Sequence, residues 1–101
     1  MVDRLEISVA HEGSAAVLTV TGDIDVANVE PFRRALFQPA GEGRLVVDVN
    51  AVSYLDSAGI AALFERAKKG PLEVLASPGC PVRRVLEVVA IDRLATLTPS
   101  R

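Results

Sequence analysis

Strand-like and helix-like segments alternate along this chain, and their order limits the folds that it can adopt. Two β-type runs open the sequence, and the four residues between them include Gly13, which is typical of a hairpin. Helical stretches then separate the remaining strands. Strands are predicted at 5–10, 15–21, 44–49, 72–76 and 94–98. Because strands joined through a helix run parallel within one sheet, the order ββαβαβαβ predicts an α/β fold with a mixed, mainly parallel sheet and an antiparallel N-terminal hairpin.

The three predicted helices carry apolar residues at helical spacing. The first follows Asn28, a residue type favoured at the N-cap, and runs to Phe37 with Pro31 in its first turn, where a missing amide hydrogen does no harm. After it, residues 38–43 are expected to form a loop. The third helix covers 81–89. The second covers 60–69 and is expected to turn one apolar stripe toward the core, made of Ile60, Leu63, Phe64 and Ala67.

The size of the chain allows one domain with one hydrophobic core. Half of its 101 residues are apolar, so we expect residues 1–101 to form a single well-filled domain.

The net charge of −2 and the scattered Lys and Arg residues give no basic patch for a nucleic acid or an acidic membrane. No run of about 18 apolar residues predicts a membrane span, and no signal peptide is apparent. With only one cysteine, this pattern predicts a cytoplasmic protein.

The residues that catalysis or metal binding would need are scarce. One His and one Cys do not make a zinc site unaided, and Gly41 and Gly43 precede a strand rather than opening a helix around a phosphate. His11 falls in the predicted hairpin turn, where we expect a solvated side chain, and Cys80 is expected to be a plain buried or semi-exposed thiol. We therefore expect no metal, no cofactor and no enzymatic activity. A small enzyme or nucleotide-binding protein is the alternative from another class.

The segment 54–60 is harder to explain by folding alone. Ser57 lies at the predicted start of a helix, where backbone N–H groups are unpaired and the dipole is positive, and either Asp56 or Ser57 would serve as the N-cap. Gly59 weakens the first turn relative to alanine, so we expect it to allow close approach of another backbone or a phosphate. Ala58 and Ala62 lie opposite the predicted core stripe and are expected to be exposed. A flat face of small residues beside a hydroxyl predicts a docking surface.

Two motifs in this chain resemble those of a known family. Residues 48–60, with Asp-Ser-Ala-Gly at 56–59, and residues 21–25, Thr-Gly-Asp-Ile-Asp, are similar to the signature elements of STAS domains, specifically the bacterial anti-sigma-factor antagonists. Both stand in the element order of that family, and the resemblance covers nearly the whole chain. The chain departs from the family at Ala58, where a second serine is more usual. It also departs at its C-terminus, where the family's helix is expected to be absent or abbreviated.

The resemblance implies a switch that acts by binding a partner protein. In the family, the serine at the position of Ser57 is phosphorylated by a partner that is both anti-sigma factor and serine kinase, with a histidine-kinase-like ATPase fold; a serine phosphatase is a further expected partner. The unphosphorylated protein sequesters the anti-sigma factor and so releases a sigma factor. Asp25 matches an acidic residue implicated in docking. The expected partner-binding residues are Asp25, Asp56, Ser57, Ala58, Gly59 and Ala62.

The charge of a phosphate gives such a switch a physical basis. At Ser57 it would add about 1.5 to 2 negative charges beside Asp25 and Asp56, which opposes an interface formed by the unphosphorylated protein. A loss of about 3 kcal/mol weakens binding roughly a hundredfold. The main alternative function is a STAS subunit that regulates a membrane transporter of the phospholipid-trafficking ATP-binding-cassette type, in which a short C-terminus would be less unusual.

Overall fold

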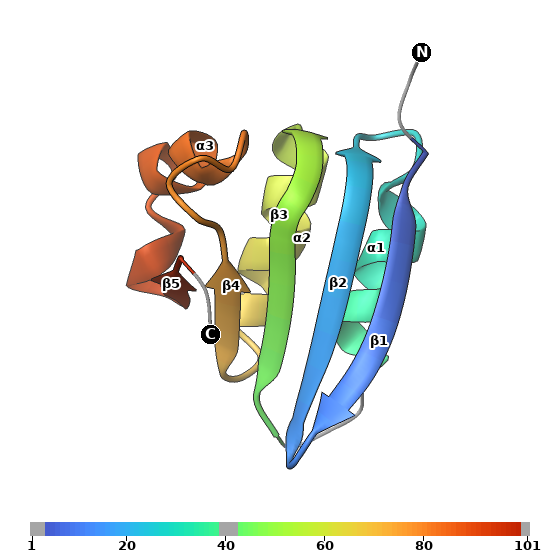
Figure 1. Cartoon of the computed structure of the whole chain (residues 1–101), viewed down its shortest axis with the longest axis vertical. Coiled ribbons are helices and arrows are strands. Elements are labelled where there is room, and N and C mark those ends of the chain that lie inside the picture. Colours follow the sequence, from blue (N-terminus) through green and yellow to red (C-terminus); the bar gives the residue numbers. More distant parts are fainter. Residues whose placement is uncertain (1–3, 39–42, 100–101) are drawn as a thin grey trace.

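The computed structural model describes residues 4–38 and 43–99, in which five strands lie side by side in sequence order (Figure 1). The first strand is antiparallel to the second, and all other neighbouring strands are parallel. The strands are β1 (Glu6–Glu12), β2 (Ala15–Ile24), β3 (Leu45–Leu55), β4 (Leu72–Leu75) and β5 (Thr96–Thr98). This sheet confirms the predicted α/β fold with its N-terminal antiparallel hairpin.

Helices α1 and α2 lie next to each other on one face of the sheet (Figure 1). The third helix and a short 3-10 helix connect β4 to β5. The helices are α1 (Val29–Phe37), α2 (Ser57–Ala67), α3 (Arg83–Val88) and the 3-10 helix η1 (Ile91–Arg93). In the described part of the chain no helix follows β5, and none of the helices is long and apolar enough to cross a lipid bilayer. The predicted loop residues 39–42 lie outside the described residues.

The hydrophobic core is formed by the sheet together with α1 and α2, and α3 and η1 also contribute buried residues to it. Successive side chains of a strand point to opposite faces, and on β2 Leu18 and Val20 are fully buried while Thr19 between them is exposed. From the helical side, α1 contributes Phe32 and Leu36, and α2 contributes Leu63, all of them fully buried. The core therefore fixes how α1 and α2 sit on the sheet, and with them the segments that precede each helix.

The two central strands are longer than the sequence predicts. The prediction places a connection at 50–55, whereas β3 continues through it to Leu55 and pairs in parallel with β2 up to Ile24. Val52 and Leu55 are buried while Ser53 is exposed, so the segment is half-buried strand. Its polar residues conceal the apolar signal. The register also shifts twice along the β2–β3 pair, which adjusts the alternation near its end.

Gly22 is required where β2 lies against the backbone of Arg4 and Leu5, just before β1. Its φ of +95° lies in the region that residues with a side chain avoid, and a Cβ at this position would clash with the carbonyl oxygen of Arg4 and lie 2.8 Å from the carbonyl carbon. The glycine of the 21–25 motif is thus explained by backbone packing.

Replacing this glycine is expected to destabilise the fold. Gly22→Ala should lower the free energy of unfolding by at least about 2 kcal/mol, since it adds both left-handed strain and overlap with backbone atoms. Urea denaturation followed by circular dichroism measures the change. The matched control is Gly79→Ala, because a Cβ there meets no atom within 4 Å. Equal stability of the two variants would contradict this explanation of Gly22.

Candidate functional site

The carboxyl ends of β2 and β3 meet at one edge of the sheet, and the segments that leave them form the site. Ile24 and Leu55 are paired at this edge, so Asp25 and Asp56 follow at equivalent positions of adjacent parallel strands. The amide of Asp56 donates a hydrogen bond to the carbonyl of Ile24 at 3.2 Å. The chain then enters the β2–α1 loop (residues 25–28) on one side and α2 on the other. The topology therefore brings the two predicted motifs together.

The Asp56 carboxylate joins these two segments. One oxygen, Oδ1, accepts hydrogen bonds from the amides of Ala58 at 2.9 Å and Gly59 at 3.4 Å, so Asp56 is the N-cap of α2. The other, Oδ2, accepts from the amide of Val26 at 3.1 Å. A single side chain thus holds the first turn of α2 and the β2–α1 loop in a fixed relation. Of the two predicted N-cap residues, the structure selects Asp56 and leaves Ser57 as the first residue of the helix.

The β2–α1 loop is ordered by its own side chains. The Oδ1 atom of Asp25 accepts from the amides of Ala27 at 2.9 Å and Asn28 at 3.1 Å. The Asn28 side chain makes two further hydrogen bonds. Its Oδ1 accepts from the amide of Asp25 at 2.8 Å, and its Nδ2 donates to the carbonyl of Asp23 at 2.9 Å. Asn28 occupies the predicted N-cap position of α1, but its side chain makes no bond to the helix amides. It stabilises the loop instead.

Ser57 is exposed at the centre of this arrangement. Among the residues that the structure describes, its hydroxyl has no hydrogen-bond partner. Asp56 directly precedes Ser57, and Asp25 directly precedes Val26, whose amide binds Asp56. Both aspartates are half-buried. One turn further along α2, Ala61 is also exposed. The hydroxyl is therefore open to another molecule and stands next to fixed negative charge.

Sequence reasoning missed two exposed apolar side chains at this edge. Val26 is 75% exposed in the β2–α1 loop, and Tyr54 is 53% exposed near the end of β3. The only signal in the sequence is that Val26 stands among loop residues, away from any apolar stripe. We define the Ser57 surface as Asp25, Val26, Asp56, Ser57 and Ala61.

The predicted exposure of Ala62 is wrong. Ala62 is fully buried, and Ala58 is half-buried against the core. The buried face of α2 consists of Gly59, Ala62, Leu63 and Arg66. The predicted stripe residues Ile60 and Phe64 lie at its flanks and are only half-buried. The small residues face inward because α2 packs closely on the sheet and on α1, and the exposed alanine is Ala61.

The prediction that Gly59 serves a ligand rather than folding is also wrong. Gly59 is buried, and a Cβ at this position would clash with the side chain of Leu55 and lie 2.8 Å from Cγ2 of Ile24. The glycine lets the first turn of α2 rest directly on the ends of β2 and β3. It therefore positions Asp56 and Ser57 without itself being available to a partner.

Arg66 is a charged residue on the buried face of α2, a position that the apolar periodicity of the sequence did not predict. It is 7% exposed and donates to two backbone carbonyls, from Nε to Leu36 at 3.2 Å and from Nη1 to Gly70 at 3.1 Å. Burial lowers the pKa of its guanidinium from the usual value. These bonds satisfy carbonyls at the end of α1 and beyond the end of α2.

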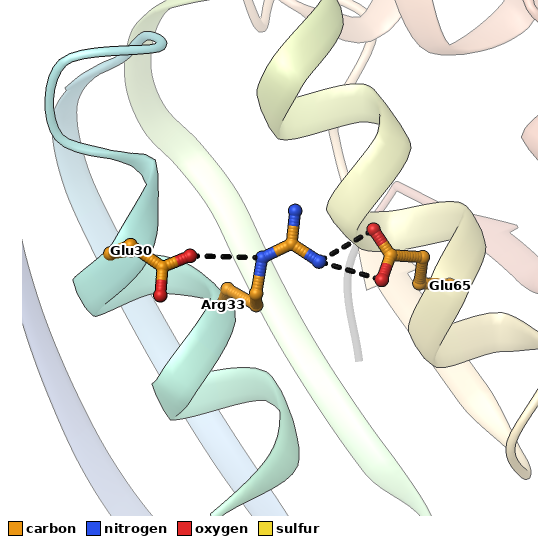
Figure 2. A network of polar contacts seen from close by, with 3 residues as sticks. All are labelled: Glu30, Arg33 and Glu65. Carbon is orange, nitrogen blue, oxygen red and sulfur yellow. Dashed lines mark hydrogen bonds and ion pairs between the residues drawn. The ribbon is translucent and has the colours of Figure 1, made fainter.

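A second arginine connects the same two helices at their surface. Figure 2 shows Arg33 of α1 between Glu30, at 3.2 Å, and Glu65 of α2, whose two oxygens both lie 2.6 Å from Nη1. The hydrogen bond and charge of Glu65 raise the pKa of Arg33 above its usual value. Because α1 and α2 both begin at the Ser57 surface, this network supports the relative position of its two halves.

The remaining candidate groups lie apart from this surface. His11 belongs to β1, where it pairs with Ala16, rather than to the hairpin turn. Cys80 is buried and its thiol donates to the carbonyl of Val49 at 3.2 Å, as expected for a plain structural thiol. Within residues 4–38 and 43–99, no three His, Cys, Asp or Glu side chains are grouped so as to hold a metal ion.

Removing the Asp56 carboxylate is expected to loosen the site. Asp56→Ala should lower the free energy of unfolding by about 1 to 2 kcal/mol, because the N-cap bonds of α2 and the bond to Val26 are lost together. Hydrogen exchange of the Val26 amide should speed up, as measured by NMR. Asp56→Asn retains a capping oxygen and should lose less than half as much stability. Unchanged exchange at Val26 in Asp56→Ala would show that this bond does not hold the loop.

Comparisons with known proteins agree with this architecture. The family model described as the STAS domain matches residues 6–101. The anti-sigma-F factor antagonist RsfB of Mycobacterium tuberculosis is 26% identical over 96 residues, which cover 90% of this chain and 79% of RsfB. An anti-sigma factor antagonist from Mycobacterium paratuberculosis superimposes with a TM-score of 0.85 at 24% identity, over 97% of this chain and 88% of that one. The Bacillus cell fate determinant SpoIIAA in its phosphorylated form gives 0.61 at 20% identity, over 91% and 90%.

Proposed function

The chain belongs to the STAS domain family, and we propose that it is an anti-sigma factor antagonist that binds its partner through the Ser57 surface. RsfB, which covers most of this chain, is named as an antagonist of this kind, and this favours the antagonist over the transporter subunit as the function. The protein would act by binding, without catalysis of its own. Its partner would be an anti-sigma factor, held away from a sigma factor while the complex lasts.

Phosphorylation of Ser57 would control this binding. The amides of Ala58 and Gly59, which would otherwise attract an anion to the helix start, already donate to Asp56. A phosphate on Ser57 would therefore extend from the surface toward an incoming partner. It would add about 1.5 to 2 negative charges beside Asp56 and Asp25. An interface that covers this surface would then bury like charges together, and its affinity would fall.

The same geometry leaves Ser57 accessible to a modifying partner. A kinase must reach a serine hydroxyl, and that of Ser57 is exposed on a rigid helix start. The anti-sigma factor would itself be this kinase, with a histidine-kinase-like ATPase fold, so that the residue that it modifies lies in its own binding site. A serine phosphatase would restore the unphosphorylated form. Such a cycle needs ATP and would operate in the cytoplasm.

The single observation that carries this proposal is the exposed Ser57 hydroxyl between the Asp56 cap and Ala61, which has no hydrogen-bond partner among residues 4–38 and 43–99. A release experiment tests it. The chain is added to a purified complex of the source organism's anti-sigma factor and sigma factor, and the products are separated by size-exclusion chromatography. We expect free sigma factor and a new complex of the chain with the anti-sigma factor. An intact starting complex at excess chain would contradict the proposed function.

A further inference from the structure

A groove lies between β1 and α1, at the free edge of the sheet and away from the exposed face of α2. Its volume is about 700 Å³, and its apolar lining includes Leu5, Ile7 and Val9 from the strand side and Ala35 from the helix. A smaller hollow that shares Val9 and Ala35 continues it toward His11. The groove therefore follows the strand for most of its length.

The groove exists because α1 covers β2 more fully than β1. Val9 pairs with Leu18, and Ile7 pairs with Val20, so these β1 side chains share the helix-covered face of the sheet. Leu18 is 0% exposed, but Val9 is 51% exposed. β1 is also the edge of the described sheet, hydrogen-bonded only to β2. An edge strand with apolar side chains on one face is a template for another strand.

Two arginines give the groove its charge. Arg4 and Arg34 both line it, and within the described residues neither forms an ion pair. The other arginine of this helix, Arg33, is bound by two carboxylates. Because the whole chain carries a net charge of −2, this local positive charge does not follow from a generally basic surface. An anionic group is the complementary partner for it.

The spacing of the two arginines bears on the shape of the ligand. Arg4 lies near the level of Asp23, two residues beyond the pairing of Glu6 with Thr21, and Asn28 binds the carbonyl of Asp23. Arg34 lies six residues after Asn28, and a helix rises about 9 Å over six residues. Carboxylates two or four residues apart on one side of an extended chain are about 7 or 13 Å apart, within reach of two flexible arginine side chains.

We propose that this β1–α1 groove binds an extended acidic segment of a partner protein. The segment adds to β1 as a further strand, and its main chain bonds to the free edge. Alternate side chains enter the groove, with an apolar residue against Ile7 and Val9 between two acidic residues that meet Arg4 and Arg34. This inference does not depend on the antagonist function and concerns a different face of the protein.

NMR titration of the isotope-labelled chain tests the inference. The probe is the synthetic peptide acetyl-Thr-Glu-Thr-Ile-Thr-Glu-Thr-amide, compared with the same peptide in which both Glu residues are Gln. We expect amide shifts to concentrate on β1 and the facing side of α1, and the Gln peptide to bind at least fivefold more weakly. Arg4→Gln and Arg34→Gln should each weaken the acidic peptide at least threefold. The matched control Arg84→Gln, at an exposed position of α3, should change its affinity less than twofold.

Four results would overturn the inference. They are shifts centred elsewhere on the protein, equal binding of the acidic and Gln peptides, unchanged affinity in Arg34→Gln, and no binding at millimolar peptide. Sodium dodecanoate is titrated in parallel as a single-headed amphiphile. Dodecanoate shifts in the groove without peptide binding would assign the groove to a lipid-like ligand and contradict the proposal. Unchanged core resonances in each variant establish that the fold is intact.

Discussion

Ala62→Arg is expected to lower the free energy of unfolding by at least about 3 kcal/mol, because it forces an unpaired charge and a long side chain into the core. Ala62 is 0% exposed, on the face of α2 that packs on the sheet. Since small domains are stable by only about 5 to 15 kcal/mol, much of the variant should be unfolded at moderate urea. Urea denaturation followed by circular dichroism measures the change.

The neighbouring substitution Ala61→Arg is the matched control. Ala61 is exposed, so the same side chain there should change the stability by no more than about 0.5 kcal/mol. It should nonetheless weaken binding of the anti-sigma factor at least tenfold, because it places bulk on the Ser57 surface. A stable Ala62→Arg variant would mean that the buried face of α2 is assigned wrongly. A stable Ala61→Arg variant with full affinity would exclude this part of α2 from the interface.

Ser57→Asp is expected to weaken binding of the anti-sigma factor at least tenfold while leaving the fold intact. The new carboxylate adds a charge beside Asp56 and Asp25, as a phosphate would, and a tenfold loss corresponds to about 1.4 kcal/mol. An acidic residue in the first turn of a helix is favourable to its dipole, so the stability should not fall. Ser57→Ala removes only the hydroxyl and should bind in both the presence and the absence of ATP. Isothermal titration calorimetry measures the affinity of the original protein and of both variants for the anti-sigma factor.

Ser14→Asp controls for the added charge alone. Ser14 is exposed at the turn between β1 and β2, at the opposite end of the sheet from the Ser57 surface (Figure 1). Its replacement by Asp should leave the affinity within twofold of the original. Comparable losses in Ser14→Asp and Ser57→Asp would show that the effect comes from net charge rather than from the place of the charge.

The order of elements and the position of Ser57 follow from local sequence patterns. Alternating strand and helix signals predict the sheet, and Asp56 and Ser57, two residue types favoured at an N-cap, predict a hydroxyl at a helix start. The second bond of Asp56, to Val26, joins residues 30 positions apart and has no local signal. The same holds for the paired ends of β2 and β3, which bring Asp25 and Asp56 together. These features depend on the tertiary arrangement.

The rotation of α2 shows why periodicity alone fails at this site. Positions 60, 63, 64 and 67 and positions 59, 62, 63 and 66 have the same helical spacing, and the first set is the more apolar. The structure buries the second set, because Gly59 and Ala62 allow close packing and Arg66 binds the carbonyls of Leu36 and Gly70. Hydrophobicity favours large side chains inside, whereas the small distance between α2 and the strands requires small ones.

The most direct test of the proposed switch compares the chain before and after phosphorylation at Ser57. Homogeneous phosphoserine at this position is verified by mass spectrometry, and both forms are titrated with the anti-sigma factor in a calorimeter. We expect the unphosphorylated chain to form a one-to-one complex and the phosphorylated chain to bind at least a hundredfold more weakly, a loss of about 3 kcal/mol. Equal affinity of the two forms would contradict the account of Ser57 as the residue that controls binding.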